Sequence, residues 1–183
     1  TDYVDILQLH NPDAETAEKS GLVDLLNELK DSGVVKHIGC SSKSPDLATY
    51  IEWNAFDVFQ IPYSALERQH ENLITQAAQA GAGIIIRGGV ARGEPGSGLG
   101  GEDRWTKFEQ ANLDELLEDG ESRTGFLLRF TLSHPHCHTT IVGTMNPNHL
   151  TENVKIAEKG ALPADVYEEA KKRLDAVGES PEA

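Results

Sequence analysis

The first stretch of the sequence ends in a side chain that can do chemistry. Residues 1–10, TDYVDILQLH, form an apolar run that finishes with the imidazole of His10. Because side chains alternate along a strand, His10 shares one face with Ile6 and Gln8. A strand that is apolar on both faces is typical of a parallel sheet covered by helices, in which ligands bind beyond the carboxyl ends of the strands. The sequence therefore predicts that His10 lies at a ligand site.

A second group of reactive side chains gathers near residue 136 and resembles a set of metal ligands. It consists of His134, His136, Cys137 and His138. Pro135 interrupts the segment, and alternation places His136 and His138 on one face with Cys137 on the other. That leaves too few ligands for a closed zinc site. We therefore expect no metal.

A glycine-rich segment, Gly88 to Gly101, contains seven glycines and Pro95, so it cannot form a regular element. We expect a long mobile loop, and such loops in compact domains are usually functional. Gly96, Gly98 and Gly101 fit the dinucleotide-binding pattern G-x-G-x-x-G. The match begins nine residues after the preceding strand, whereas the fingerprint requires a tight turn that opens a helix. A flexible loop is therefore the better interpretation.

The elements that must position these groups follow from hydrophobic periodicity and from glycine and proline. Five apolar runs are predicted as strands, at residues 1–10, 34–40, 56–61, 84–87 and 139–142. Helices are predicted at residues 22–32, 45–53, 66–80, 105–117, 121–132, 146–159 and 165–177, and the polar stretch 11–20 is expected to be a loop. Alternation of strand and helix implies an α/β fold with a parallel sheet. A doubly wound sheet and a barrel both fit this pattern.

Bulk properties narrow the class of protein. The 183 residues fit one domain, with residues 1–177 folded and residues 178–183 expected to be a disordered tail. A formal charge of −14 argues against binding to nucleic acid or to an anionic membrane. Two cysteines and no apolar run of membrane-spanning length favour a cytoplasmic protein. The chain begins with Thr1, close to a strand, which suggests that it was cut from something longer.

Five segments, in their order and spacing, resemble the second part of an aldo-keto reductase. They read TDYVDILQLHNP, GVVKHIGCSS, DVFQIPYSALER, GAGIIIRGGVARG and TIVGTMNPNHLTENV. The resemblance runs from residue 1 to about residue 160 and implies a partial TIM-type (β/α)8 barrel. The five parallel strands would correspond to the fourth through eighth strands of that barrel, with the first three missing. The implied activity is hydride transfer between NADP or NAD and a small-molecule aldehyde or ketone.

The resemblance also implies roles for individual residues. His10 matches the active-site histidine that orients the substrate carbonyl. Ser41, Ser42 and Gln60 match the residues that hold the nicotinamide carboxamide. Arg87 stands where many members place an aromatic ring that stacks on the nicotinamide, and a guanidinium plane can also stack. The remaining cofactor-binding positions are Gly88 in the pyrophosphate loop, Gly143, Thr144, Asn146 and His149 near the 2′-phosphate, and Glu152 and Asn153 near the adenine.

Each candidate has a structural alternative. His10 could be a buried histidine bonded to the backbone, and Gln60 could be a satisfied core amide. Ser41 and Ser42 could be turn or cap residues before the helix that begins near Pro45. Members of the family that select NADP place lysine or arginine in the last segment, where this chain has neither. Preference between NADP and NAD is therefore left open.

Two interpretations of the function stay open. In the family the proton donor is a tyrosine that a lysine and an aspartate make more acidic, and all three lie on strands before the matched region. We therefore expect residues 1–183 alone not to turn over substrate. The alternative is a non-catalytic module that binds a nucleotide or docks on a partner, comparable to the channel-associated subunits of the family.

Overall fold

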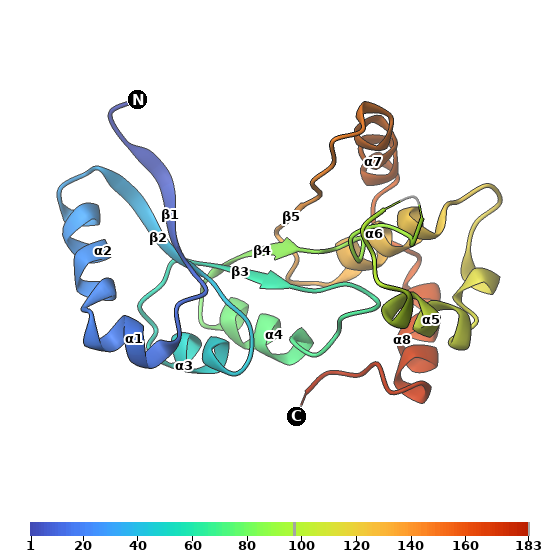
Figure 1. The fold of residues 1–183 in the computed structure, drawn as a ribbon, viewed down its shortest axis with the longest axis horizontal. Coiled ribbons are helices and arrows are strands. Elements are labelled where there is room, and N and C mark those ends of the chain that lie inside the picture. The colour runs from blue at the N-terminus through green and yellow to red at the C-terminus, as the bar shows by residue number, and fades with distance from the viewer. Residues whose placement is uncertain (97, 183) are drawn as a thin grey trace. The chain divides into compact units, whose positions relative to one another are not determined.

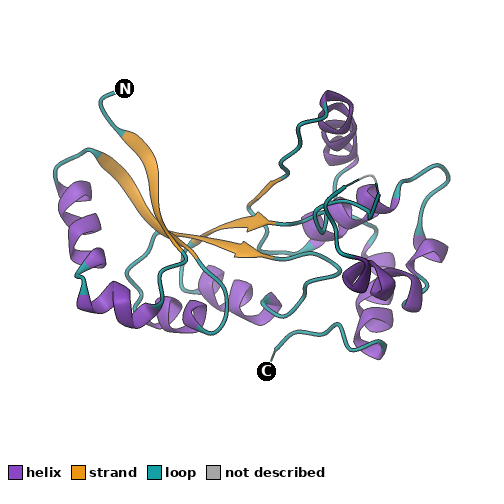
Figure 2. Ribbon diagram, in the orientation of Figure 1, coloured by secondary structure: helices purple, strands orange, loops and turns teal. Residues whose placement is uncertain are grey.

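The computed structural model describes residues 1–96 and 98–182, shown in Figures 1 and 2. Ser97 of the expected glycine loop and Ala183 of the expected tail lie outside the described residues. Contacts divide the chain into two compact units, which we describe separately. The first unit contains Thr1–Ile61 and Asn72–Ile85, and the second contains Pro62–Glu71 and Ile86–Ala183. In the part of the chain that the structure describes, no helix is both long and apolar enough to span a membrane.

Five strands form one sheet, and each corresponds to a predicted strand. Their bounds are β1 Val4–His10, β2 Val35–Ser41, β3 Val58–Pro62, β4 Gly83–Arg87 and β5 Thr139–Ile141. The strand order is β1-β2-β3-β4-β5, and the β1-β2 and β2-β3 pairs are parallel. In a doubly wound sheet the order reverses at a switch point, whereas neighbours in a barrel follow chain order. The topology is therefore that of part of a TIM-like barrel.

Helices of the first unit lie on one side of its strands, as Figure 1 shows. They are α1 Ala14–Lys19, α2 Leu22–Asp31, α3 Asp46–Glu52 and α4, which spans Glu71–Gln79 and belongs to this unit from Asn72 onward. The core beneath them is apolar and almost fully buried. Its members are Ile38, Cys40, Leu47, Tyr50, Ile51, Phe59, Ile61, Ile74 and Ala77. Strand residues at alternate positions face these helices, which leaves the other face of the strands for a ligand.

Helix α1 corrects the predicted loop at residues 11–20. The carboxylate of Asp13 accepts a hydrogen bond from the backbone N–H of Thr16 at 2.8 Å, which caps the helix. Ala14 and Ala17 are its buried residues. Because these side chains are small, the helix carries no strong apolar stripe, and the composition of the segment resembles that of a loop. The prediction was therefore wrong.

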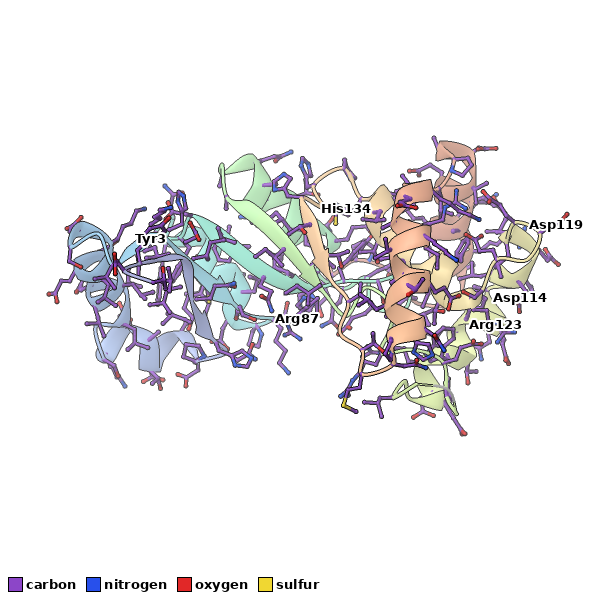
Figure 3. All side chains as sticks on the ribbon, turned by 90° about the horizontal axis from the view of Figure 1, so that it is seen from above. Tyr3, Arg87, Asp114, Asp119, Arg123 and His134 are labelled. Atoms are coloured by element: carbon purple, nitrogen blue, oxygen red, sulfur yellow. The ribbon has the colours of Figure 1, made fainter. Side chains whose placement is uncertain are left out.

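The second unit is built around α6, Arg123–Ser133, whose residues from Gly125 to Thr131 are all buried. Its other helical elements among the described residues are α5 Glu102–Gln110, the 3-10 turn η1 Leu113–Leu116, α7 Pro147–Lys159 and α8 Ala164–Ala176. The single helix predicted at residues 105–117 is interrupted at Asn112, which has a φ of 48°. Arg123 crosses to this region and pairs with Asp114 (Figure 3), where the Nη2–Oδ2 distance is 2.6 Å.

A buried arginine organises residues 62–71 and the carboxyl end of the chain. Arg68 is 1% exposed and pairs with Glu71 at 2.8 Å and with Asp175 at 2.7 Å. Its backbone N–H donates to the carboxylate of Glu179 at 2.6 Å. The helix predicted from Leu66 therefore begins only at Glu71. Residues 178–182, expected to be disordered, make defined contacts because Glu179 reaches this cluster.

Candidate functional site

Three polar residues lie side by side across the carboxyl ends of neighbouring strands. In the register of the parallel sheet, His10 is opposite Ser41, and Ser41 is opposite Gln60. Adjacent strands are roughly 4.8 Å apart, and residues in register point to the same face. The first unit thus places the imidazole, the hydroxyl and the amide in one row. We call His10, Ser41 and Gln60 the polar row.

The polar row faces away from the helices of its unit. Cys40 and Phe59, the neighbours of Ser41 and Gln60 along their strands, are 0% and 3% exposed and belong to the core under the helices. Burial raises the pKa of the Cys40 thiol to about 12, so this cysteine is inert at neutral pH. The face that carries the polar row is therefore the face on which a barrel places its interior.

Gln8 lies on the same face as the polar row, two residues before His10 in β1. Its Nε2 donates to Oε1 of Gln60 at 3.4 Å. Alternation along the strand predicted that Gln8 lies on this face, but the sequence analysis predicted no functional role for it. Two buried polar atoms here, Oε1 of Gln8 and Oγ of Ser41, have no hydrogen-bond partner among the described residues. Buried polar groups are nearly always paired, so these atoms indicate a ligand site.

Ser42 occupies a different position from the polar row. It is 2% exposed, and its backbone N–H donates to the carbonyl of Gln60 at 3.2 Å. Its hydroxyl donates to the carbonyl of Lys43 at 3.4 Å. Helix α3 has Pro45 at its N-cap and no side-chain cap bond, so neither Ser41 nor Ser42 caps this helix. Only Ser41 of the pair therefore presents a free hydroxyl.

Arg87 and Gly88 mark the end of β4 in the second unit. The Nε atom of Arg87 is buried and has no partner in the described chain, while its carbonyl accepts from the backbone N–H of Tyr63 at 3.1 Å. Gly88 has a φ of 75°, a conformation that side chains strongly disfavour. The chain therefore turns sharply after Arg87 and enters the glycine loop.

The candidate adenosine-binding residues gather at the start of α7. Asn146 caps this helix, and its Oδ1 accepts from the backbone N–H of Asn148 at 3.0 Å. Gly143, Thr144 and His149 are exposed. The amino terminus of a helix attracts anions such as phosphate, because its N–H groups are unsatisfied there. This end of α7 is thus open to a charged ligand.

The two residues matched to the adenine differ in their contacts. The carboxylate of Glu152 accepts a hydrogen bond from the hydroxyl of Ser122 at 3.0 Å, which ties α7 to the start of α6. Asn153 is half-buried. Glu152 therefore has a structural contact whether or not it also meets a nucleotide.

The histidine and cysteine group near residue 136 does not form a metal site in the described residues. No set of three histidine, cysteine, aspartate or glutamate side chains there is arranged to hold a metal ion. Burial lowers the pKa of His134 to about 4, and its Nδ1 accepts from the backbone N–H of His136 at 3.1 Å. His134 is a neutral core residue with a structural hydrogen bond.

Three of the four tyrosines, Tyr50, Tyr63 and Tyr167, are buried and hydrogen-bonded. Burial raises the pKa of Tyr50 and of Tyr167 to about 12, and burial also raises the pKa of Tyr63 well above its ordinary value. The hydroxyls of Tyr63 and Tyr167 share a hydrogen bond of 3.1 Å, and that of Tyr50 donates to a backbone carbonyl at 2.9 Å. Tyr3 precedes β1 and lies beneath the ammonium group of Lys36, 3.8 Å from its ring centre.

The structure thus groups the candidate residues into two sets, one in each unit. The polar row and Ser42 belong to the first unit. The second unit contains Arg87, Gly88 and the residues at the start of α7.

One feature of the sequence could have identified Gln8 as a site residue. It is Gly39, a glycine inside a strand, and such a glycine often marks the close approach of another group.

Comparisons with known proteins show to which family the chain is similar. A model of the aldo/keto reductase family matches residues 1–175. YqkF, an uncharacterised oxidoreductase of Bacillus subtilis, is 24% identical over 176 residues, covering 88% of this chain and 57% of that protein. The NADH-specific methylglyoxal reductase of Escherichia coli is 35% identical over 95 residues, covering 47% of this chain and 27% of that protein.

A solved structure is also similar. Aldo-keto reductase AKR11C1 from Bacillus halodurans, in its holo form, matches with a TM-score of 0.80 and 25% identity, covering 94% of this chain and 59% of that one. The chain therefore spans less than two thirds of the length of YqkF and of AKR11C1. Since the family model covers nearly all of the chain and the fold agrees, the chain belongs to the aldo/keto reductase family.

Proposed function

We propose that the protein is an NAD(P)H-dependent reductase that converts aldehydes or ketones to alcohols. The observation that carries this proposal is the polar row, in which the buried Ser41 hydroxyl lies beside the amide of Gln60 and has no partner among the described residues. A carboxamide offers both hydrogen-bond donors and an acceptor, so it suits this combination of groups. The residues present therefore fit a nicotinamide.

The bound cofactor would supply a hydride to the carbonyl carbon, while the carbonyl oxygen takes up a proton. His10 is exposed at the end of β1, in register with Ser41. An imidazole there can donate a hydrogen bond to the carbonyl oxygen and orient it. Ser41 and Gln60 would hold the carboxamide. In the second unit, the guanidinium of Arg87, whose Nε has no partner among the described residues, offers a plane that can stack on an aromatic ring.

We further propose that residues 1–183 bind cofactor but do not turn over substrate by themselves. The engaged hydroxyls and raised pKa values of Tyr50, Tyr63 and Tyr167 support this, because none of these tyrosines is suited to deliver a proton at neutral pH. Val4, Ile6 and Leu7 are exposed on β1, whose one partner among the described strands is β2. Further strands of the complete protein would pair there and close the barrel.

We also propose that the site binds NADH and NADPH with comparable affinity. The segment from Gly143 to Asn153 contains no lysine or arginine to pair with a 2′-phosphate. Titration with each dinucleotide, followed by nicotinamide fluorescence, should give dissociation constants within about threefold. A preference for NADPH above tenfold would contradict the assignment of His149.

The catalytic proposal is tested in the gene product that contains this chain. Replacing His10 by glutamine should lower kcat/KM for aldehyde reduction by about 10²–10³ and leave the NADH dissociation constant unchanged. His37→Gln is the matched control, since His37 shares the face of β2 with Ser41 but lies four residues from it. Binding of NADH without any reductase activity in the complete protein would instead favour the non-catalytic module.

A further inference from the structure

The contact between Gln8 and Gln60 links two strands that are not neighbours. β1 and β3 each pair with β2, which lies between them. Nevertheless, Nε2 of Gln8 reaches Oε1 of Gln60 at 3.4 Å. The two amides therefore meet above the middle strand, on the face that carries the polar row.

Gly39 of β2 makes this contact possible. It lies in register between Gln8 and Val58, and a Cβ atom on Gly39 would be 3.0 Å from Cγ of Gln8 and 2.8 Å from the carbonyl oxygen of Val58. Any other residue would fill the space that the side chain of Gln8 crosses. The absence of a Cβ atom on Gly39 therefore leaves room both for the carbonyl of Val58 and for the side chain of Gln8.

The contact fixes the orientation of the amide of Gln60. An amide has a donor end and an acceptor end, and its oxygen here receives the N–H of Gln8. Oε1 of Gln8 is itself buried without a partner in the described chain, as is Oγ of Ser41. A buried acceptor that lacks a partner is costly unless a ligand donates to it.

We propose that Gln8 belongs to the nicotinamide subsite, where it holds the amide of Gln60 and accepts a hydrogen bond from the N–H2 end of the cofactor carboxamide. This inference rests on the proposed function. Gln8 would bind the carboxamide group itself, in contrast to residues that bind the phosphates or the adenosine. Gln8 would therefore contribute to selection among dinucleotides that differ only in this substituent.

The test compares NAD+ with 3-acetylpyridine adenine dinucleotide, which keeps the carbonyl and replaces N–H2 by methyl. Dissociation constants are measured by calorimetry on the gene product that contains this chain. The unaltered protein should bind NAD+ about tenfold more tightly than the analogue. Gln8→Met, which has a similar shape but no amide, should reduce this preference to about one, a loss that equals about 1.4 kcal/mol. Gln79→Met, on the exposed side of α4, is the matched control.

A second variant covers the case in which Gln8→Met fails to fold. Gln8→Glu keeps an acceptor but cannot donate to Gln60 when it is ionised. The amide of Gln60 would then turn its N–H2 end toward the carboxylate, and affinity for both dinucleotides should fall while the preference for NAD+ persists. Loss of that preference in Gln8→Glu would contradict the assigned acceptor role.

The outcomes separate this inference from the function on which it rests. If the unaltered protein binds neither dinucleotide, the proposed function fails. If it binds NAD+ without preference over the analogue, or if Gln8→Met keeps the preference, the assignment of Gln8 is overturned while the proposed function stands. An equal loss of affinity for both dinucleotides in Gln8→Met would indicate a purely structural role and would also overturn it.

Discussion

Gly39→Ala is the change whose effect the structure defines best. The added Cβ atom would lie 2.8 Å from the carbonyl oxygen of Val58, which is backbone, and 3.0 Å from Cγ of Gln8. Side-chain rotation can relieve the second contact but not the first. We therefore expect β2 and β3 to separate locally and Gln8 to move away from Gln60.

Two opposing terms set the size of the effect. Alanine inside a strand is favoured over glycine by about 0.5–1 kcal/mol, because glycine loses more backbone entropy on folding. Overpacking in a well-packed region costs about 1–3 kcal/mol. The second term is the larger, so we expect the free energy of unfolding to fall by about 1–2 kcal/mol.

Urea denaturation followed by circular dichroism measures this loss of stability. If the free energy of unfolding falls with urea concentration at the same slope in both proteins, the unfolding reaction is the same. Gly83→Ala is the matched control. Its Cβ atom would lie 3.5 Å from Cγ2 of Val58 and 3.7 Å from the carbonyl oxygen of Asp57, which are ordinary contacts. We expect that variant to be neutral or slightly stabilised. If Gly39→Ala is as stable as Gly83→Ala, the steric argument for Gly39 is refuted.

Two further predictions concern the second unit. Burial lowers the pKa of His134 to about 4, below its ordinary value of about 6.5, so stability is complete above pH 6.5 and falls by about 3 kcal/mol as the pH drops to 4. His134→Asn, which keeps an acceptor for the N–H of His136, should flatten this slope in urea titrations at several pH values, and a slope that persists would refute the prediction. Glu179→Ala should lower the free energy of unfolding by about 1–3 kcal/mol, because it leaves the N–H of Arg68 buried without its acceptor. A change within 0.5 kcal/mol would show that the Glu179 carboxylate contributes no stability.

The strands could be predicted from the sequence because each is a short apolar run next to glycine or a polar turn. Residues 34–40, predicted from VVKHIGC, became β2 at Val35–Ser41, and residues 139–142 became β5 at Thr139–Ile141. Periodicity contains no information about the order of strands in a sheet, so a barrel and a doubly wound sheet fitted equally well. The observed sequential order decides between them.

Two segments, residues 11–20 and the carboxyl end, depend on contacts between residues distant in sequence. The N–H of Ala14 at the start of α1 donates to Asp46, 32 residues further along the chain. Glu179 is held by Arg68, 111 residues away. Neither contact leaves a periodic signal within a short window, and both segments are polar. Local patterns therefore favoured a loop at residues 11–20 and disorder after residue 177.

The candidate site shows the same division between local and distant information. Alternation along one strand was enough to place His10 and Gln8 on a common face. Recognising that Gln8 meets Gln60 requires the register of three strands together, since Gly39 must lie between the two amides. A glycine inside a strand lowers the stability of that strand, so its presence needs a reason. In this chain a Cβ atom on Gly39 would meet both the carbonyl oxygen of Val58 and the side chain of Gln8. Residues that flank such a glycine on the neighbouring strands should therefore be considered when a ligand site is sought.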